Sequence, residues 1–157
     1  MDQILSKYSQ LQKFNVSRET CLDFEKFTSM IIKKNKEINI ISKNTEKAEI
    51  IKERHIIDSV QAIDFIDLKC KSITDLGSGG GFPGIIIAIM LKNMKNNTKI
   101  KLYEKSYHKA RFLSNISEKL NLDIEVIQKD VFESSELAVS YTHLRAHETD
   151  SYLVCRL

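Results

Sequence analysis

The stretch from Asp75 to Gly84, which reads DLGSGGGFPG, constrains this chain more than any other feature. It holds all five glycines of the protein and its only proline. A short β-prone segment, 71–74, precedes it, and an apolar segment, 85–91, follows it. Glycine adopts positive φ at sharp turns and lets a ligand approach the backbone closely. A strand, a glycine-rich loop and a helix in this order predict the opening of a nucleotide-binding βαβ unit.

The second half of the chain continues with alternating strand and helix patterns. We expect strands over 72–76, 99–103 and 124–127, and helices over 83–95 and 106–120. Strands that are joined by helices of this length predict an α/β fold with a parallel sheet and right-handed crossovers.

The first seventy residues show helical periodicity instead. Helices are expected over 2–13, from a cap at Ser17 to about residue 34, and over 46–65. With 157 residues, 42% of them apolar, the chain is long enough for one domain with its own core. We therefore predict a single domain over 1–137, in which 1–70 is a helical extension and 71–137 begins the sheet.

The strand and helix pattern stops near Glu136. Residues 139–157 follow neither period, so we expect only the first three strands of the sheet. Either 138–157 is an irregular tail or the chain has lost its natural continuation. The pattern favours the second reading, in which this tail is not native sequence.

Composition limits the compartment and the partners. The net charge of +3 permits an acidic partner such as RNA. Three cysteines without a C-x-x-C spacing predict reduced thiols in a cytoplasmic protein and no metal site. The longest apolar run, 85–91, is too short to span a bilayer, and the N-terminus lacks the pattern of a signal peptide.

Two ligand-binding templates fit the loop. Gly79, Gly81 and Gly84 match the dinucleotide motif G-x-G-x-x-G, which is a weak signal alone. Asp75, Gly77, Gly79 and Gly81 match the methyltransferase loop that holds S-adenosylmethionine. The acid before the first glycine favours this second template, because it can engage an amine but repels a pyrophosphate. The missing Gly-Lys-Ser/Thr excludes a P-loop.

The next two strands also end in groups that could bind a nucleoside. The Glu104 carboxylate can accept hydrogen bonds from both ribose hydroxyls, although NAD sites use the same device. Asp130 can accept from an adenine amino group, and the backbone N–H of Val131 can reach a ring nitrogen. Phe132 or Phe82 could cover the adenine ring.

The chain resembles the RsmG family, also called GidB, of guanine-N7 methyltransferases that act on bacterial small-subunit ribosomal RNA. The glycine loop, 75–84, resembles the family signature, in which an apolar residue and Pro-Gly close the loop. The segments 35–40, 54–59 and 109–113 resemble the family's asparagine-rich link, the helix before its sheet and its basic-aromatic helix. The resemblance covers residues 20–133.

The resemblance implies a Rossmann-like class I methyltransferase fold and S-adenosylmethionine-dependent methylation of guanine N7 in 16S ribosomal RNA. It implies a cytoplasmic protein, expected to be a monomer, that works on the small ribosomal subunit. It implies cofactor contacts from Gly77, Phe82, Glu104 and the pair 131–132, and makes Lys109 and Arg111 RNA-binding candidates. Together with the template analysis, the cofactor-binding candidates are Asp75, Gly77, Gly79, Gly81, Phe82, Glu104, Asp130, Val131 and Phe132.

No catalytic acid or base is assigned, because guanine N7 has a free lone pair and no proton to lose. His55, Asp58 and Ser59 lie on one helical face, which favours a structural cluster over a catalytic one. Two alternatives stay open: a nicotinamide-dependent oxidoreductase that uses the same loop, and an inactive truncated fragment with an exposed sheet edge.

Overall fold

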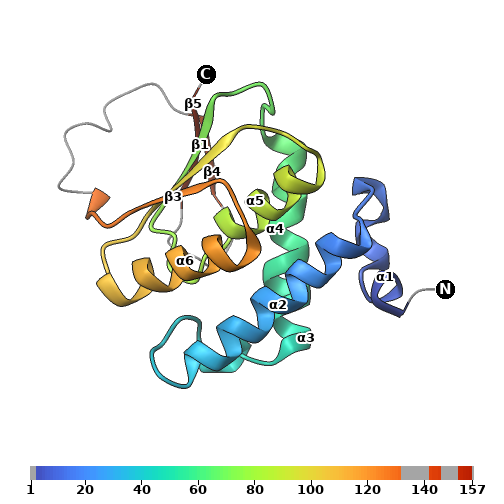
Figure 1. The fold of residues 1–157 in the computed structure, drawn as a ribbon, viewed down its shortest axis with the longest axis horizontal. Helices are drawn as coiled ribbons and strands as arrows, with labels where there is room; N and C mark the ends of the chain where they lie inside the picture. The colour runs from blue at the N-terminus through green and yellow to red at the C-terminus, as the bar shows by residue number, and fades with distance from the viewer. Residues whose placement is uncertain (1–2, 132–141, 146–151, 157) are drawn as a thin grey trace.

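A computed structural model of the chain describes residues 3–131, and it describes 142–145 and 152–156 as backbone only. Its centre is a five-stranded sheet in the order β3-β2-β1-β5-β4 (Figure 1). Phe132 and the predicted boundary at residues 137 and 138 lie outside the described residues.

The parallel part of the sheet confirms the prediction from the sequence. Strands β1 (Ser72–Leu76), β2 (Lys99–Tyr103) and β3 (Ile124–Ile127) have the predicted bounds. Leu76 pairs with Tyr103, and Tyr103 pairs with Ile127, so all three strands end at one edge of the sheet. This common edge is where an open parallel sheet binds its ligands.

The expectation of no further strand was wrong. β5 (Tyr152–Arg156) pairs antiparallel with β1, and β4 (Thr142–Arg145) pairs antiparallel with β5. β1 would otherwise present an unpaired edge, and a strand that satisfies its N–H and C=O groups is favoured there. Segments this short show no readable period, although Tyr152 and Val154 are β-prone. In the structure, β1 is therefore paired on both sides.

The helices of the second half begin and end where local chemistry predicts. α5 (Gly84–Asn93) starts one residue after Pro83, and α6 (Tyr107–Leu120) starts at a cap, where the Ser106 hydroxyl accepts from the Lys109 N–H. Asn121 ends α6 in the left-handed conformation. α5 contacts β2 on one side and two helices of the extension, α2 (Arg18–Asn35) and α4 (Asp58–Gln61), on the other. Contact on both sides explains why α5 is apolar all round.

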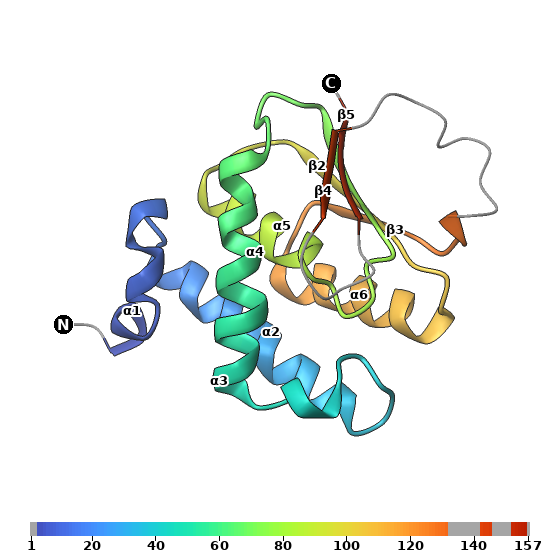
Figure 2. The ribbon, with the colours of Figure 1, turned by 180° about the vertical axis from the view of Figure 1, so that it is seen from behind.

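The helical extension is confirmed, with more breaks than the periodicity predicted. In chain order it consists of α1 (Gln3–Lys7), η1 (Ser9–Phe14), α2 (Arg18–Asn35), η2 (Lys43–Thr45), α3 (Ala48–Ile51), η3 (Lys52–Ile57), α4 (Asp58–Gln61) and η4 (Ala62–Phe65). Figure 2 shows that the pieces from α3 to η4 form one continuous rod beside α2. Its middle section, η3, is a π-helix, which periodicity did not predict. No helix in the described part of the chain is long and apolar enough to cross a membrane.

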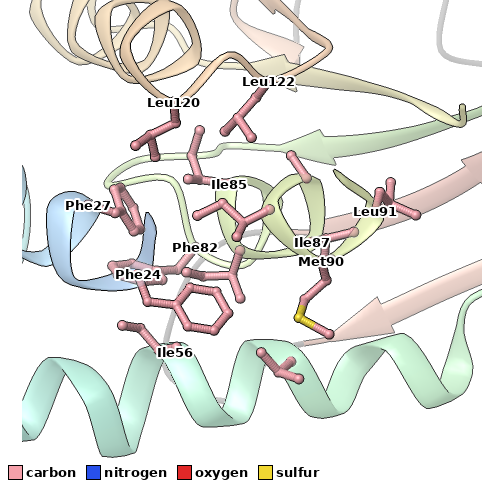
Figure 3. Close-up of a cluster of buried hydrophobic side chains, with 14 of the residues drawn as sticks. Phe24, Phe27, Ile56, Phe82, Ile85, Ile87, Met90, Leu91, Leu120 and Leu122 are labelled. Atoms are coloured by element: carbon pink, nitrogen blue, oxygen red, sulfur yellow. The ribbon is translucent and has the colours of Figure 1, made fainter. Parts of the chain in front are cut away.

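The extension and the sheet share one hydrophobic core. Phe24 and Phe27 of α2, Ile56 of the rod and Phe82 of the glycine loop lie together in it (Figure 3). Polar contacts hold the same interface, because the Lys92 ammonium of α5 binds the Asp23 carboxylate of α2 at 3.0 Å. The helical extension therefore shares its core with the sheet, and this core includes Phe82 of the glycine loop.

Removing a ring from this shared core should destabilise the protein. Phe27 is completely buried and Phe65 is 71% exposed, so the same substitution tests the two environments. We expect Phe27→Ala to lower the free energy of unfolding by about 3–5 kcal/mol. Phe65→Ala should change it by less than about 0.5 kcal/mol. Urea denaturation measures both, and equal losses would contradict a core that joins the extension to the sheet.

Candidate functional site

A pocket of about 740 Å³ lies at the carboxyl ends of β1, β2 and β3. Its size falls within the range of roughly 300–1,000 Å³ that is usual for small-molecule sites. One side, here called the sheet wall, is formed by Leu76, Gly77, Ser78, Gly79, Gly80, Phe82, Tyr103, Glu104, Lys105, Lys109, Lys129, Asp130 and Val131. The other side, here called the extension wall, is formed by Ile40, Ile41, Ser42, Thr45 and His55.

Most of the predicted site residues meet in this pocket. The candidates that line it are Gly77, Gly79, Phe82, Glu104, Lys109, Asp130 and Val131. Asp75, Gly81 and Arg111 are not among the lining residues. The contacts of Asp75 and Gly81 show that these two residues have structural roles.

The glycine loop takes a shape that side chains would oppose at several places, and Gly79 and Gly81 show two different reasons. Gly79 has φ +51°, and a Cβ there would meet nothing closer than the Gly77 oxygen at 3.7 Å, so the space above it is open. Gly81 has φ +96°, and a Cβ there would lie 2.6 Å from Ile85 Cγ1. Gly79 thus offers bare backbone to the pocket, whereas Gly81 lets the loop pack against α5.

Glu104 joins the glycine loop to the end of β2. Its carboxylate accepts hydrogen bonds from the Gly79 N–H at 2.8 Å and from the Ser106 N–H at 2.8 Å. Only 7% of the residue is exposed. A carboxylate offers about four acceptor positions, so two remain for ligand hydroxyls. Glu104 therefore shapes the loop and still presents acceptors to the pocket.

Asp75 performs a related task away from the pocket. It is completely buried, and its carboxylate accepts from the Gly84 N–H at 3.1 Å. This bond holds the first turn of α5 against the end of β1, where the peptide N–H groups of the helix favour a negative charge. Asp75 is not among the residues that line the pocket. Its predicted contact with the amine of a ligand stays a prediction.

An aromatic stack joins the two walls. The His55 ring stacks on Phe82 with centroids 4.8 Å apart and an interplanar angle of 25°, and Phe27 lies behind Phe82 at 5.1 Å. His55 lies in the π-helical section η3, a type of turn that is frequent at functional sites. The helical spacing groups His55 with Asp58 and Ser59 and gives no sign of its place in the pocket.

A buried asparagine shapes the extension wall. The Asn35 amide oxygen accepts from the N–H groups of Ile40 and Ile41 at 2.8 and 2.9 Å. The Asn35 amide nitrogen donates to the Glu46 carboxylate at 3.1 Å. Asn35 is 8% exposed. The sequence showed only the resemblance of 35–40 to an asparagine-rich link, because the partners of Asn35 are set by a turn that has no periodic signal.

Three lysines and two acids line the pocket. Lys105 and Lys129 are exposed lining residues next to the two acids Glu104 and Asp130, and Lys109 lines the same mouth. Lysines at a pocket mouth suit phosphate groups. Within residues 3–131, no cluster of three or more His, Cys, Asp or Glu side chains could hold a metal ion.

The two bonds of Glu104 predict a measurable loss when one acceptor is removed. Glu104→Gln keeps the shape of the side chain but replaces an acceptor oxygen with an NH₂ group that faces a backbone N–H. We expect a loss of about 1–3 kcal/mol in the free energy of unfolding. Glu118→Gln, on the exposed surface of α6, is the matched control and should be neutral. Equal chemical denaturation midpoints for both variants would contradict the structural role of Glu104.

Comparison with known proteins identifies the family. The family model described as GidB, rRNA small subunit methyltransferase G, matches residues 20–151. A relative from Pelagibacter ubique with the name ribosomal RNA small subunit methyltransferase G is 53% identical over 137 residues, which cover 87% of this chain and 64% of the relative. Relatives of the same name from Bartonella henselae and Orientia tsutsugamushi are 42% and 38% identical.

These matches cover only part of each relative. The Bartonella match covers 78% of this chain and 56% of the relative, and the Orientia match covers 73% and 54%. The chain thus spans less than two thirds of the length of these relatives. The matches give no support to the oxidoreductase alternative, because these relatives are all named methyltransferases. On its sequence, the chain belongs to the GidB family, the rRNA small subunit methyltransferases G.

Proposed function

We propose that the pocket binds S-adenosylmethionine and that the complete protein transfers its methyl group to N7 of a guanine in 16S ribosomal RNA. The observation that carries the proposal is Glu104, an acceptor-only group at the end of β2 that is bonded to the glycine loop and faces the pocket. Family membership supports the reaction, since the relatives are named for ribosomal RNA methylation.

The residues of the sheet wall fit this cofactor. Gly77 and Gly79 would lie against its amino acid portion, because the space above Gly79 is open. Glu104 would accept from the ribose hydroxyls with the oxygen positions that its two backbone bonds leave unused. Asp130 and the Val131 N–H would meet the adenine. When bound, the cofactor supplies a methyl group on a positively charged sulfur.

The chain's own contribution would be orientation and exclusion of water. Guanine N7 has no proton to lose, so no residue needs to act as a general base before transfer. Ile40, Ile41 and Phe82 bring apolar surface to the pocket, which keeps the reacting groups dry. Alignment of the acceptor with the methyl group would account for most of the acceleration. Accordingly, we assign no catalytic acid or base.

RNA would approach over the mouth of the pocket. Lys109 lines the pocket, and Arg111 lies exposed on the same helix, where its guanidinium is 3.5 Å from the Tyr107 hydroxyl. Both could contact phosphates, which position RNA without reading its sequence. The implied setting is the cytoplasm, with the small ribosomal subunit as the partner and the protein as a monomer.

Cofactor binding by this chain tests the first half of the proposal. Isothermal titration calorimetry should show saturable binding of S-adenosylmethionine, and NADH fluorescence should not change on addition of the protein. Glu104→Ala should weaken binding by about tenfold or more, since it removes a charged acceptor from buried hydroxyls. Enhanced NADH fluorescence without S-adenosylmethionine binding would contradict the proposal.

The site of methylation needs a full-length relative, because this chain spans 64% of the Pelagibacter protein. That relative, given 16S ribosomal RNA and tritiated S-adenosylmethionine, should place the label on N7 of guanine. Digestion to nucleosides and chromatography locate the label. Label on an exocyclic amine or on ribose would show that the N7 assignment is wrong.

A further inference from the structure

We infer that the extension wall is the binding site for the purine ring of the acceptor nucleotide. The pocket would then hold the cofactor on its sheet wall and the base on its extension wall. The inference rests on the proposed function and deepens it, because it assigns the acceptor to residues of the helical extension.

The chemistry of the extension wall suits a flat base with polar edges. Ile40 and Ile41 supply apolar surface, and Ser42 and Thr45 supply hydroxyl groups. The Thr45 hydroxyl donates to the Ser42 carbonyl at 2.9 Å, so its oxygen can still accept. The Ser42 hydroxyl accepts from the Asn44 N–H at 3.4 Å, so its proton can still be donated. A purine edge presents both donors and acceptors, and this wall can match both.

The two walls are held at a fixed spacing. The Asn35 side chain fixes the backbone of Ile40 and Ile41. The side chains of these two isoleucines lie close to Gly80 of the glycine loop. A Cβ at Gly80 would lie 3.1 Å from the Cγ2 atoms of both isoleucines. The glycine at this position therefore lets the two isoleucines lie close against the loop. Fixed spacing between two bound reactants is what a transfer without acid–base chemistry requires.

The aromatic stack lies where the two walls meet. His55 belongs to the extension wall and lies against Phe82 of the sheet wall with nearly parallel rings. Phe82 is 5% exposed and His55 is half-buried, so His55 is the more accessible residue of the pair. Bases stack well on such rings, and the lysines at the mouth of the pocket could hold the adjoining phosphate.

The experiment measures base binding separately from cofactor binding. The full chain is saturated with S-adenosylhomocysteine and titrated with a short single-stranded RNA that contains one 2-aminopurine, whose fluorescence falls when it stacks. Ser42→Leu fills the extension wall, and Asn44→Leu is the matched control, exposed on the same turn but outside the pocket. We expect Ser42→Leu to weaken the quenched complex by about tenfold, as for the loss of one base contact. Asn44→Leu should bind as the wild type does.

A second pair of variants tests the ring stack. His55→Leu should weaken the quenched complex by a similar factor, and His55→Phe, which keeps a ring, should restore it. Calorimetry with S-adenosylhomocysteine should give the same affinity for Ser42→Leu and Asn44→Leu, which shows that these two variants fold and keep the sheet wall. A Ser42→Leu variant that binds like the wild type, or an Asn44→Leu variant that loses as much, would overturn the inference.

The wild type separates the two proposals. If it binds S-adenosylhomocysteine but does not quench 2-aminopurine, the inference about the extension wall is wrong and the cofactor site stands. If it binds neither S-adenosylhomocysteine nor S-adenosylmethionine, the proposed function itself fails, and the inference fails with it.

Discussion

The hydrogen bond from the Gly79 N–H to the Glu104 carboxylate is the contact on which the site depends. It joins a loop after β1 to the end of β2, and the same carboxylate holds the start of α6 through Ser106. Asp75 makes the corresponding bond to Gly84 at the start of α5. Two buried carboxylates thus tie both helices and the glycine loop to the strand ends. A loop that is held in this way is formed before a ligand arrives, which lowers the entropic cost of binding.

The helical extension completes the site instead of merely preceding it. Phe27, Phe82 and His55 form a continuous row of rings from α2 through the glycine loop to the rod. Because this row belongs to the shared core, a change in how the extension packs would also move one wall of the pocket. This coupling gives a physical reason for a methyltransferase sheet to carry a helical extension of seventy residues in front of it.

Much of this architecture could be predicted from the sequence. The bounds of β1, β2 and β3 followed from short apolar segments between loop residues, and the caps at Ser17 and Ser106 followed from local hydrogen bonding. The pocket position of Glu104 followed from topology, since parallel strands end at one edge. Each of these features depends on residues that are close in sequence or on a general rule of the fold.

The remaining features depend on contacts between distant segments. The sequence does not reveal that Asp75 binds Gly84 instead of lining the pocket, or that residues 40–45 face the glycine loop. The π-helical turn that carries His55 has no periodic signal, and the tail's two strands are explained by the open edge of β1. These features result from packing between distant segments and not from local propensity.

We propose that a preformed pocket at the ends of β1, β2 and β3 holds the cofactor. Titration of the ¹⁵N-labelled chain with S-adenosylmethionine, followed by amide resonances, tests it most directly. We expect saturable shifts of the Gly77, Gly79 and Val131 amides, while the Gly84 amide, bonded to buried Asp75, changes little. Saturable shifts that leave these three amides unmoved, or no shifts at any concentration, would contradict it.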